Sequence, residues 1–293
     1  MPDALAWPCP AKINLALAVG QPLPPDHPRA GMHPIASWFA PIALADTLSV
    51  TRLAQSASSH YTITRADRQP VDWPIDHDLA VRAHRALEQF LSRTLPIHLD
   101  LTKHIPPGTG LGGGSSNAAS TLLALNQLFE LNIPHITLAR IASNLGSDIA
   151  FFIDDQPPRP ALVTGLGEQI ERLPPLQLPI LLILPPFACH TPAVYRTFDT
   201  LAYQPAHLDH ACTIARTADT QQLFNDLWPA AQLVAPQLTH IHARATHALS
   251  APVHLSGSGS ALFAIAPADH ASTLARALPE CIILSTHTLA PTD

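Results

Sequence analysis

The stretch HLDLTKHIPPGTGLGGGSSNAASTLLALNQLF, residues 98–129, carries the most information about the fold. Residues 98–102 alternate between polar and apolar side chains, which predicts a strand. A glycine-rich turn follows, and the apolar residues after Ser115 are typical of a helix. The sequence therefore predicts a strand, a glycine loop and a helix in direct succession.

The loop PPGTGLGGGSSNAAS, residues 106–120, has the character of a phosphate-binding site. It contains five glycines, Gly108, Gly110, Gly112, Gly113 and Gly114. Glycine lets the backbone adopt positive φ and approach a ligand closely, and the first amides of a helix lack intrahelical partners. The loop is not a Walker A motif, because the lysine of that motif is absent, and its spacing is not that of a dinucleotide fingerprint. A simple tight turn is the alternative, but such a turn needs fewer glycines.

Three further segments contain residues whose chemistry needs an explanation. PAKINLAL (10–17) places Lys12 at the start of a predicted strand, LGSDIAFFI (145–153) places Asp148 before an apolar run, and HLSGSGSALFAI (254–265) is a second turn of small residues. A charged group among apolar neighbours is costly to bury unless it is paired. Taken singly, each has an ordinary reading: a surface lysine, a capping aspartate and a tight hairpin.

Periodicity predicts the remaining elements. Strands are expected at 13–19, 47–51, 61–64, 179–184, 281–285 and within 252–266, and helices at 78–91, 136–145, 220–234, 236–249 and 268–278. Asp78 is the expected N-cap of the first of these helices.

The composition favours a compact protein of two modest domains. Of 293 residues, 47% are hydrophobic and 13% charged, which is too apolar for a disordered chain. The net charge of −6 argues against nucleic acid as a partner. Four scattered cysteines, Cys9, Cys189, Cys212 and Cys281, suggest free thiols in a reducing compartment. Without an apolar run of membrane-spanning length or a signal-like start, no membrane association and a cytoplasmic location are expected.

Together and in this order, the four segments resemble the GHMP kinase superfamily. The resemblance implies an α+β fold of two domains. The N-terminal domain, residues 1–165, would have the ribosomal protein S5 domain 2-like fold and hold the ATP-binding glycine-rich loop. The C-terminal domain, residues 166–293, would be ferredoxin-like.

The same resemblance implies a catalytic pair and an ATP site. Lys12 and Asp148 correspond to the catalytic residues, with Asp148 as the base that accepts the hydroxyl proton. ATP would be bound by Lys103, Pro106, Gly108, Gly110, Leu111, Gly112, Gly113, Gly114, Ser115, Ser116 and Asn117. Mg²⁺ is implied as a second cofactor, with either Ser115 or Ser116 as a candidate ligand.

Within the superfamily, the sequence is most similar to the branch whose small-molecule substrate is a cytidine diphosphate-linked polyol. Substrate contacts would then come from Asn14, His33, Tyr195, Gly257, Ser258 and Gly259, with His33 reading the cytosine. The sequence departs from the branch at residues 30–33, where Ala-Gly-Met-His replaces Asp-Gly-Tyr-His, so that Met32 stands where a ring would stack. Asp78 also replaces an asparagine near the adenine.

Two other functions stay open at this point. The changed residues 30–33 suggest a GHMP kinase for another small alcohol, such as homoserine or mevalonate. The second open function is a non-catalytic sensor that binds ATP and a ligand, although Lys12 and Asp148 argue against it.

A metal site at His240, His242 and His247 is disfavoured, because histidines two apart on a helix point in different directions. The oligomeric state is left as monomer or homodimer.

Overall fold

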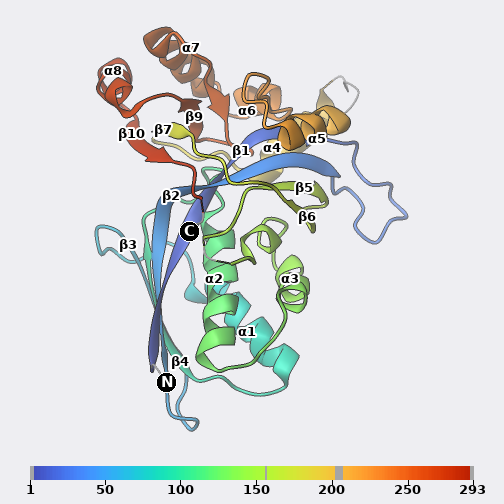
Figure 1. Ribbon diagram of the computed structural model, residues 1–293, viewed down its shortest axis with the longest axis vertical. Helices are drawn as coiled ribbons and strands as arrows, with labels where there is room; N and C mark the ends of the chain where they lie inside the picture. The colour runs from blue at the N-terminus through green and yellow to red at the C-terminus, as the bar shows by residue number, and fades with distance from the viewer. Residues whose placement is uncertain (1–2, 156, 202–206, 291–293) are drawn as a thin grey trace. The chain divides into compact units, whose positions relative to one another are not determined.

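The computed structural model describes residues 3–155, 157–201 and 207–290, which form two compact units. Unit 1 consists of Met1–Ala11, Leu44–Pro106 and Gly112–Pro158, and unit 2 of Lys12–Ala43, Pro107–Leu111 and Arg159–Asp293. The long strands β1 (Ala4–Val19) and β2 (Ile35–Arg52) each contribute residues to both units (Figure 1). The expected domain boundary at 165/166 stays a prediction.

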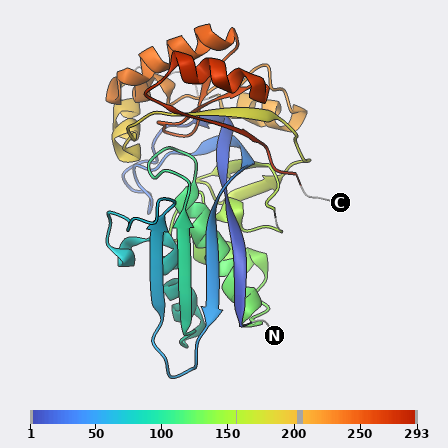
Figure 2. The same cartoon turned by 90° about the vertical axis from the view of Figure 1, so that its left-hand side faces the viewer.

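Unit 1 is a sheet covered by helices. Strand β3 (His60–Arg65) pairs in parallel with β4 (Ile97–Lys103), and β4 pairs antiparallel with the second half of β2. Behind this sheet lie α1 (Leu79–Leu91), α2 (Gly113–Leu128) and α3 (His135–Ser143), as Figure 2 shows. Two short 3₁₀ helices, η1 (Ile75–His77) and η2 (Ala150–Phe152), complete the unit.

The local sequence explains where the helices of unit 1 begin and end. Asp78 caps α1 as predicted, because its Oδ1 accepts a hydrogen bond of 2.9 Å from the amide of Ala80. The helix ends at Ser92, which has φ 52°. The predicted strand, glycine loop and helix succession is confirmed as β4, the loop and α2. Most of α2 is buried, which agrees with its apolar sequence.

Unit 2 contains an antiparallel sheet of order β10-β7-β9-β8. Its strands are β7 (Pro179–Leu184), β8 (His254–Leu255), β9 (Leu262–Ile265) and β10 (Ile282–His287). The first half of β2 pairs antiparallel with β5 (Ala161–Gly165), which pairs with β6 (Gln169–Arg172). The helices are α4 (Thr191–Thr200), α5 (Leu208–Thr217), α6 (Trp228–Val234), α7 (Gln237–Leu249), η3 (Ala268–His270) and α8 (Ala271–Ala277).

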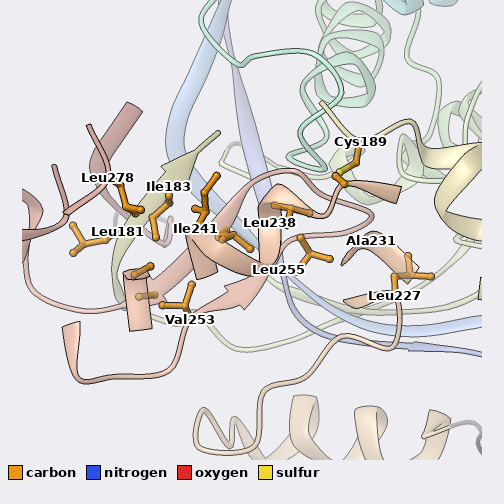
Figure 3. Close-up of a cluster of buried hydrophobic side chains, with 14 of the residues drawn as sticks. Leu181, Ile183, Cys189, Leu227, Ala231, Leu238, Ile241, Val253, Leu255 and Leu278 are labelled. Atoms are coloured by element: carbon orange, nitrogen blue, oxygen red, sulfur yellow. The ribbon is translucent and has the colours of Figure 1, made fainter. Parts of the chain in front are cut away.

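The hydrophobic core of unit 2 lies between its sheet and its helices. Leu181 and Ile183 of β7 meet Leu238 and Ile241 of α7 in one buried cluster (Figure 3). Leu17 from β1 belongs to the same cluster, so the strand that carries Lys12 is anchored at its far end by apolar burial.

The predicted helix at 220–234 is wrong for residues 220–227, because only α6 is helical. The competing interaction is long-range. The amide of Asp226 donates to the carbonyl of Leu17 (2.9 Å), and its carboxylate Oδ2 accepts from the amide of Val19 (3.0 Å). These bonds hold the chain against β1, and Pro229 then suits the first turn of α6.

The mixed α and β fold class is as expected, and the four cysteines are free thiols, as predicted. In the part of the chain that the structure describes, no helix has the length and apolar character needed to span a membrane.

Candidate active site

Lys12 is a buried lysine, only 2% exposed, in β1 of unit 2. Its Nζ donates to Asn14 Oδ1 (2.6 Å) and to the carbonyl of Gly110 (2.9 Å), and it lies 4.7 Å from the centre of the Phe39 ring. The side chain is therefore fixed by dipoles and an aromatic face, which offset part of the cost of burying a charge. The alternative reading of a surface lysine does not fit this burial.

Asn14 is held in turn by a chain of hydrogen bonds. Its Nδ2 donates to Ser37 Oγ (2.9 Å), and Ser37 Oγ donates to the carbonyl of Ala16 (2.6 Å). This arrangement fixes which end of the amide faces Lys12, because the nitrogen is committed to Ser37. The side chain of Asn14 consequently presents its oxygen to the lysine.

The turn of small residues at 256–259 contacts the first half of the glycine loop. Ser256 Oγ donates to the carbonyl of Gly110 (3.2 Å), and the amide of Asn14 donates to Ser256 Oγ (3.3 Å). A Cβ at Gly110, where φ is +79°, would lie 2.2 Å from the Ser256 carbonyl oxygen. Only glycine fits there, so the close approach of the two segments explains this residue.

The three predicted substrate residues of the turn occupy distinct places. Gly257 lies against the loop, since a Cβ there would be 3.2 Å from the carbonyl oxygen of Gly110. Ser258 Oγ is 2.7 Å from Thr191 Oγ1 at the start of α4. Gly259 lies beside Cys189, whose sulfur would be 3.4 Å from an added Cβ.

Asn225 supports this turn and was not identified from the sequence. Its Nδ2 donates to the carbonyls of Leu255 (2.9 Å) and Gly257 (2.8 Å), while its Oδ1 accepts from the amide of Leu227 (2.9 Å). It lies within the stretch expected to be helical, where an asparagine has no evident role. Its neighbours in the sequence include other polar side chains, such as Gln222 and Asp226, so no local signal sets Asn225 apart.

His33 and Tyr195, predicted to recognise the cytosine, are brought together in unit 2. Their ring centres are 5.3 Å apart, and Phe198 lies 5.9 Å from His33. His33 Nδ1 lies 2.8 Å from the carbonyl of Gly20, so this nitrogen carries the proton of the bond. Its Nε2 is 3.1 Å from Asp199 Oδ1. The arrangement is a cluster of aromatic rings with a fixed imidazole.

The second half of the glycine loop opens α2 in unit 1. Gly112 is its N-cap with φ 71°. A Cβ at Gly113 would lie 2.9 Å from a methyl carbon of Ile105, so the helix start is tightly packed. Among the described residues Ser116 Oγ is buried with no hydrogen-bond partner, whereas Ser115 is partly exposed. The unbonded amides of such a first turn are suited to hold an anion.

Lys103 is buried beside this helix in a network that centres on Asp46. Lys103 Nζ lies 2.7 Å from Asp46 Oδ2 and also donates to Asn117 Oδ1. Cys9 is part of the same surroundings, and burial raises the pKa of its thiol to about 12. The thiol is therefore uncharged and unreactive at neutral pH. Asp46 was not identified from the sequence.

Asp148 lies in unit 1, in the turn between α3 and η2. It is partly buried, and Ser147 Oγ donates a long hydrogen bond of 3.4 Å to its Oδ1. Because Lys12 belongs to unit 2, the pairing of Lys12 with Asp148 stays a prediction.

Asp78 and Pro106, also named from the resemblance, lie in unit 1. Both carboxylate oxygens of Asp78 are engaged, one by Ala80 and the other by Trp73 Nε1 at 3.1 Å. This gives the residue a capping role. Pro106 directly precedes the loop and is partly exposed.

The described residues contain no group of three or more His, Cys, Asp or Glu side chains placed to hold a metal ion. His242, one of the three histidines considered, has its Nε2 2.9 Å from the carbonyl of Val253 and packs on Trp228 at 4.6 Å between ring centres. This is a structural role.

Comparison with known proteins gives consistent results. The family profile "GHMP kinases N terminal domain" matches residues 78–158. The 4-diphosphocytidyl-2-C-methyl-D-erythritol kinase of Polynucleobacter asymbioticus is 36% identical over 260 residues, which cover 87% of this chain and 82% of that protein. A crystal structure of 4-(cytidine 5'-diphospho)-2C-methyl-D-erythritol kinase aligns with TM-score 0.75 and 30% identity over 98% of this chain and 100% of that one.

A homoserine kinase from Cytophaga hutchinsonii aligns with TM-score 0.65 over 99% of this chain and 95% of that one. Its identity of 16% shows a shared fold alone. The fold class expected from the sequence is therefore confirmed, and the two relatives above that are 30% and 36% identical are both described as kinases of a cytidine diphosphate-linked methylerythritol. The chain belongs to the GHMP kinase family.

Proposed function

We propose that this protein transfers the γ-phosphoryl group of ATP to the 2-hydroxyl of 4-diphosphocytidyl-2-C-methyl-D-erythritol, in the non-mevalonate route to isoprenoid precursors. The observation that carries the proposal is the buried ammonium of Lys12, held 2.9 Å from the carbonyl of Gly110 in the glycine loop. A cation fixed beside a phosphate-binding loop is what a phosphoryl-transfer site requires. The similarity to kinases of this name supports the choice of substrate.

In the proposed reaction the 2-hydroxyl oxygen attacks the γ-phosphorus. The bond from that phosphorus to the β–γ bridging oxygen breaks, and ADP leaves. Asp148 accepts the hydroxyl proton, and Lys12 orients the hydroxyl and offsets the charge that develops during transfer. Asn14 holds the lysine in place. The first-turn amides of α2 and the loop bind the phosphates.

The residues present fit a Mg²⁺ ion held mainly by ATP. No acidic metal site exists among the described side chains, but the buried hydroxyl of Ser116, unbonded within the described structure, is available as a ligand. This favours Ser116 over Ser115. When bound, Mg²⁺ would neutralise charge on the phosphate oxygens.

The cytidine part would bind at the aromatic cluster of unit 2. His33 would read the edge of the base and Tyr195 would stack on one face. Met32 is 41% exposed next to His33 and is able to cover a base face through dispersion and sulfur–aromatic contact. The replacement of a ring by Met32 then weakens stacking without removing it.

The direct test is ADP formation by the purified protein with Mg-ATP and 4-diphosphocytidyl-2-C-methyl-D-erythritol. We expect turnover well above the rate without acceptor. Homoserine and mevalonate serve as matched acceptors, and a faster rate with either would replace the proposed substrate. ATP binding without turnover on any of the three would indicate a sensor. A cytoplasmic location stays a prediction.

A further inference from the structure

Asp46, in β2, is a completely buried carboxylate outside the proposed catalytic pair. Its Oδ1 accepts from the amides of His104 (2.6 Å) and Ile105 (2.7 Å). Its Oδ2 lies 2.9 Å from Asn117 Nδ2 and 2.7 Å from Lys103 Nζ. Four donors satisfy the full accepting capacity of one carboxylate. Because all four donors bond to this one carboxylate, the position of each donor depends on Asp46.

The four donors lie on both sides of the glycine loop in the sequence. Residues 103–105 are the end of β4 and enter the loop, whereas Asn117 is in the second turn of α2. Asp46 therefore ties together the segments before and after the loop. The side chain of Ile105 packs against Gly113, so the position of Ile105 also affects where the first turn of α2 lies. The first turn of α2 is positioned from both directions.

Lys103 has its charge offset within this network. Its ammonium is bonded to Asp46 and to Asn117 Oδ1, and the residue is only 8% exposed. A carboxylate with no counter-charge would be costly in this interior. The lysine thus completes the Asp46 shell, which is a different role from a direct contact with ATP phosphates.

We propose that Asp46 is the positioning residue of the nucleotide-binding loop and that Lys103 acts through it. The proposal rests on the proposed function, since it assumes that the loop binds ATP. Holding the amides of the first turn of α2 in place before ATP arrives lowers the ordering cost of binding. Loss of Asp46 should then weaken ATP binding selectively and leave the alcohol site unchanged.

The test is Asp46→Asn, which keeps the size of the side chain but turns one acceptor into a donor that faces other donors. We expect the KM for ATP to rise about tenfold, corresponding to one or two lost hydrogen bonds. The KM for the alcohol should change less than about twofold. The thermal shift caused by a non-hydrolysable ATP analogue should shrink in parallel. Asp100→Asn, at an exposed carboxylate of β4, is the matched control.

A second variant covers the case in which Asp46→Asn does not fold. Asp46→Asn combined with Lys103→Met removes the orphaned ammonium, so it should recover stability while the KM for ATP stays high. A folded variant that binds ATP like the wild type would overturn the proposal. Proportional loss of activity without a change in either KM would also overturn it, because this indicates a structural role alone. If the wild-type protein showed neither stabilisation by ATP nor turnover, this result would contradict the proposed function and, with it, this inference.

Discussion

The two units each bury a lysine near one half of the glycine loop, but they hold it differently. In unit 1, Lys103 is paired with the carboxylate of Asp46. In unit 2, Lys12 donates to the amide oxygen of Asn14 and to the carbonyl of Gly110, and it lies over the ring of Phe39. The carboxylate of Asp46 offsets the charge of Lys103, whereas these dipoles orient the ammonium of Lys12. The arrangement around Lys103 stabilises the fold, and the arrangement around Lys12 suits a catalytic role.

The largest expected effect concerns the group on which Lys12 would act. Asp148→Asn should lower turnover at least about a hundredfold, because it removes the general base, while ATP affinity changes little. Steady-state kinetics and calorimetric ATP binding would measure the two effects. Asp155→Asn, at an exposed carboxylate of the same unit, is the control. Unchanged turnover in Asp148→Asn would remove the base assignment.

Replacing each of the two lysines by methionine should have different effects on the free energy of unfolding and on kcat. Lys103→Met leaves Asp46 buried without its counter-charge, so we expect a loss of about 3–5 kcal/mol in the free energy of unfolding. Lys12→Met should lower kcat at least about tenfold, because it removes the cation proposed to stabilise the transferred phosphoryl group. Denaturant unfolding and kinetics on both variants would show the contrast. An unchanged kcat in Lys12→Met would contradict the catalytic role of this lysine.

Replacing Asn225 tests whether the hydrogen bonds around Lys12 and Asn14 in unit 2 depend on the residue that supports the turn at 256–259. Asn225→Ala removes the hydrogen bonds to the carbonyls of Leu255 in β8 and Gly257 in the turn, and each is worth about 1 kcal/mol. We expect about 1–2 kcal/mol of destabilisation and a fall in kcat of roughly fivefold. Gln222→Ala is the control, because Gln222 is an exposed amide bonded to Asp219. A kcat equal to that of the control would show that the turn needs no such support.

The smallest effect is a pH dependence of stability in each unit. Burial lowers the pKa of His84 in unit 1, and burial followed by repulsion from His242 lowers the pKa of His254 from 6.5 to about 4. A folded-state pKa below the unfolded value means that folding favours the neutral ring. For His254, stability is then complete above pH 6.5 and is lost as the pH falls towards 4.

At pH 6 the loss from His254 is on the order of 1 kcal/mol. Unfolding of the wild type and of His254→Gln between pH 8 and pH 5 would measure it, with the exposed His240→Gln as control. The variant should show a flatter dependence than the wild type. An identical slope would mean that His254 titrates normally in the folded protein.

The sequence predicted those elements whose signals are local. The alternation in β4, the glycines of the loop, the capping carboxylate of Asp78 and the apolar run of β7 all depend on neighbours in the chain. The charges of Lys12 and Asp148 stand out in apolar surroundings, but their catalytic roles came from the family resemblance and stay a prediction. The apolar run after Ser115 placed the polar residues 115–117 at the start of a helix.

The rest depends on contacts between distant residues. The donors to Asp46 all lie far along the chain, from Lys103 to Asn117, so no local pattern in the sequence predicts this network. Asn225 and Asp226 lie in a segment with helical periodicity, but bonds to β1 and to the turn hold it in another conformation. Helices α4 and α5 and strands β5 and β6 were not predicted. Tertiary pairing overrides local preference at such places.

The course of β1 has a consequence for dissecting the protein. Residues 4–11 of this strand belong to unit 1 and residues 12–19 to unit 2. A fragment that ends at residue 158 would therefore still contain residues 12–43 and 107–111 of unit 2 without the rest of that unit. A fragment that starts at residue 159 would lack the strand that carries Lys12. Neither half of this kinase can be produced as an independent piece by cutting the chain once.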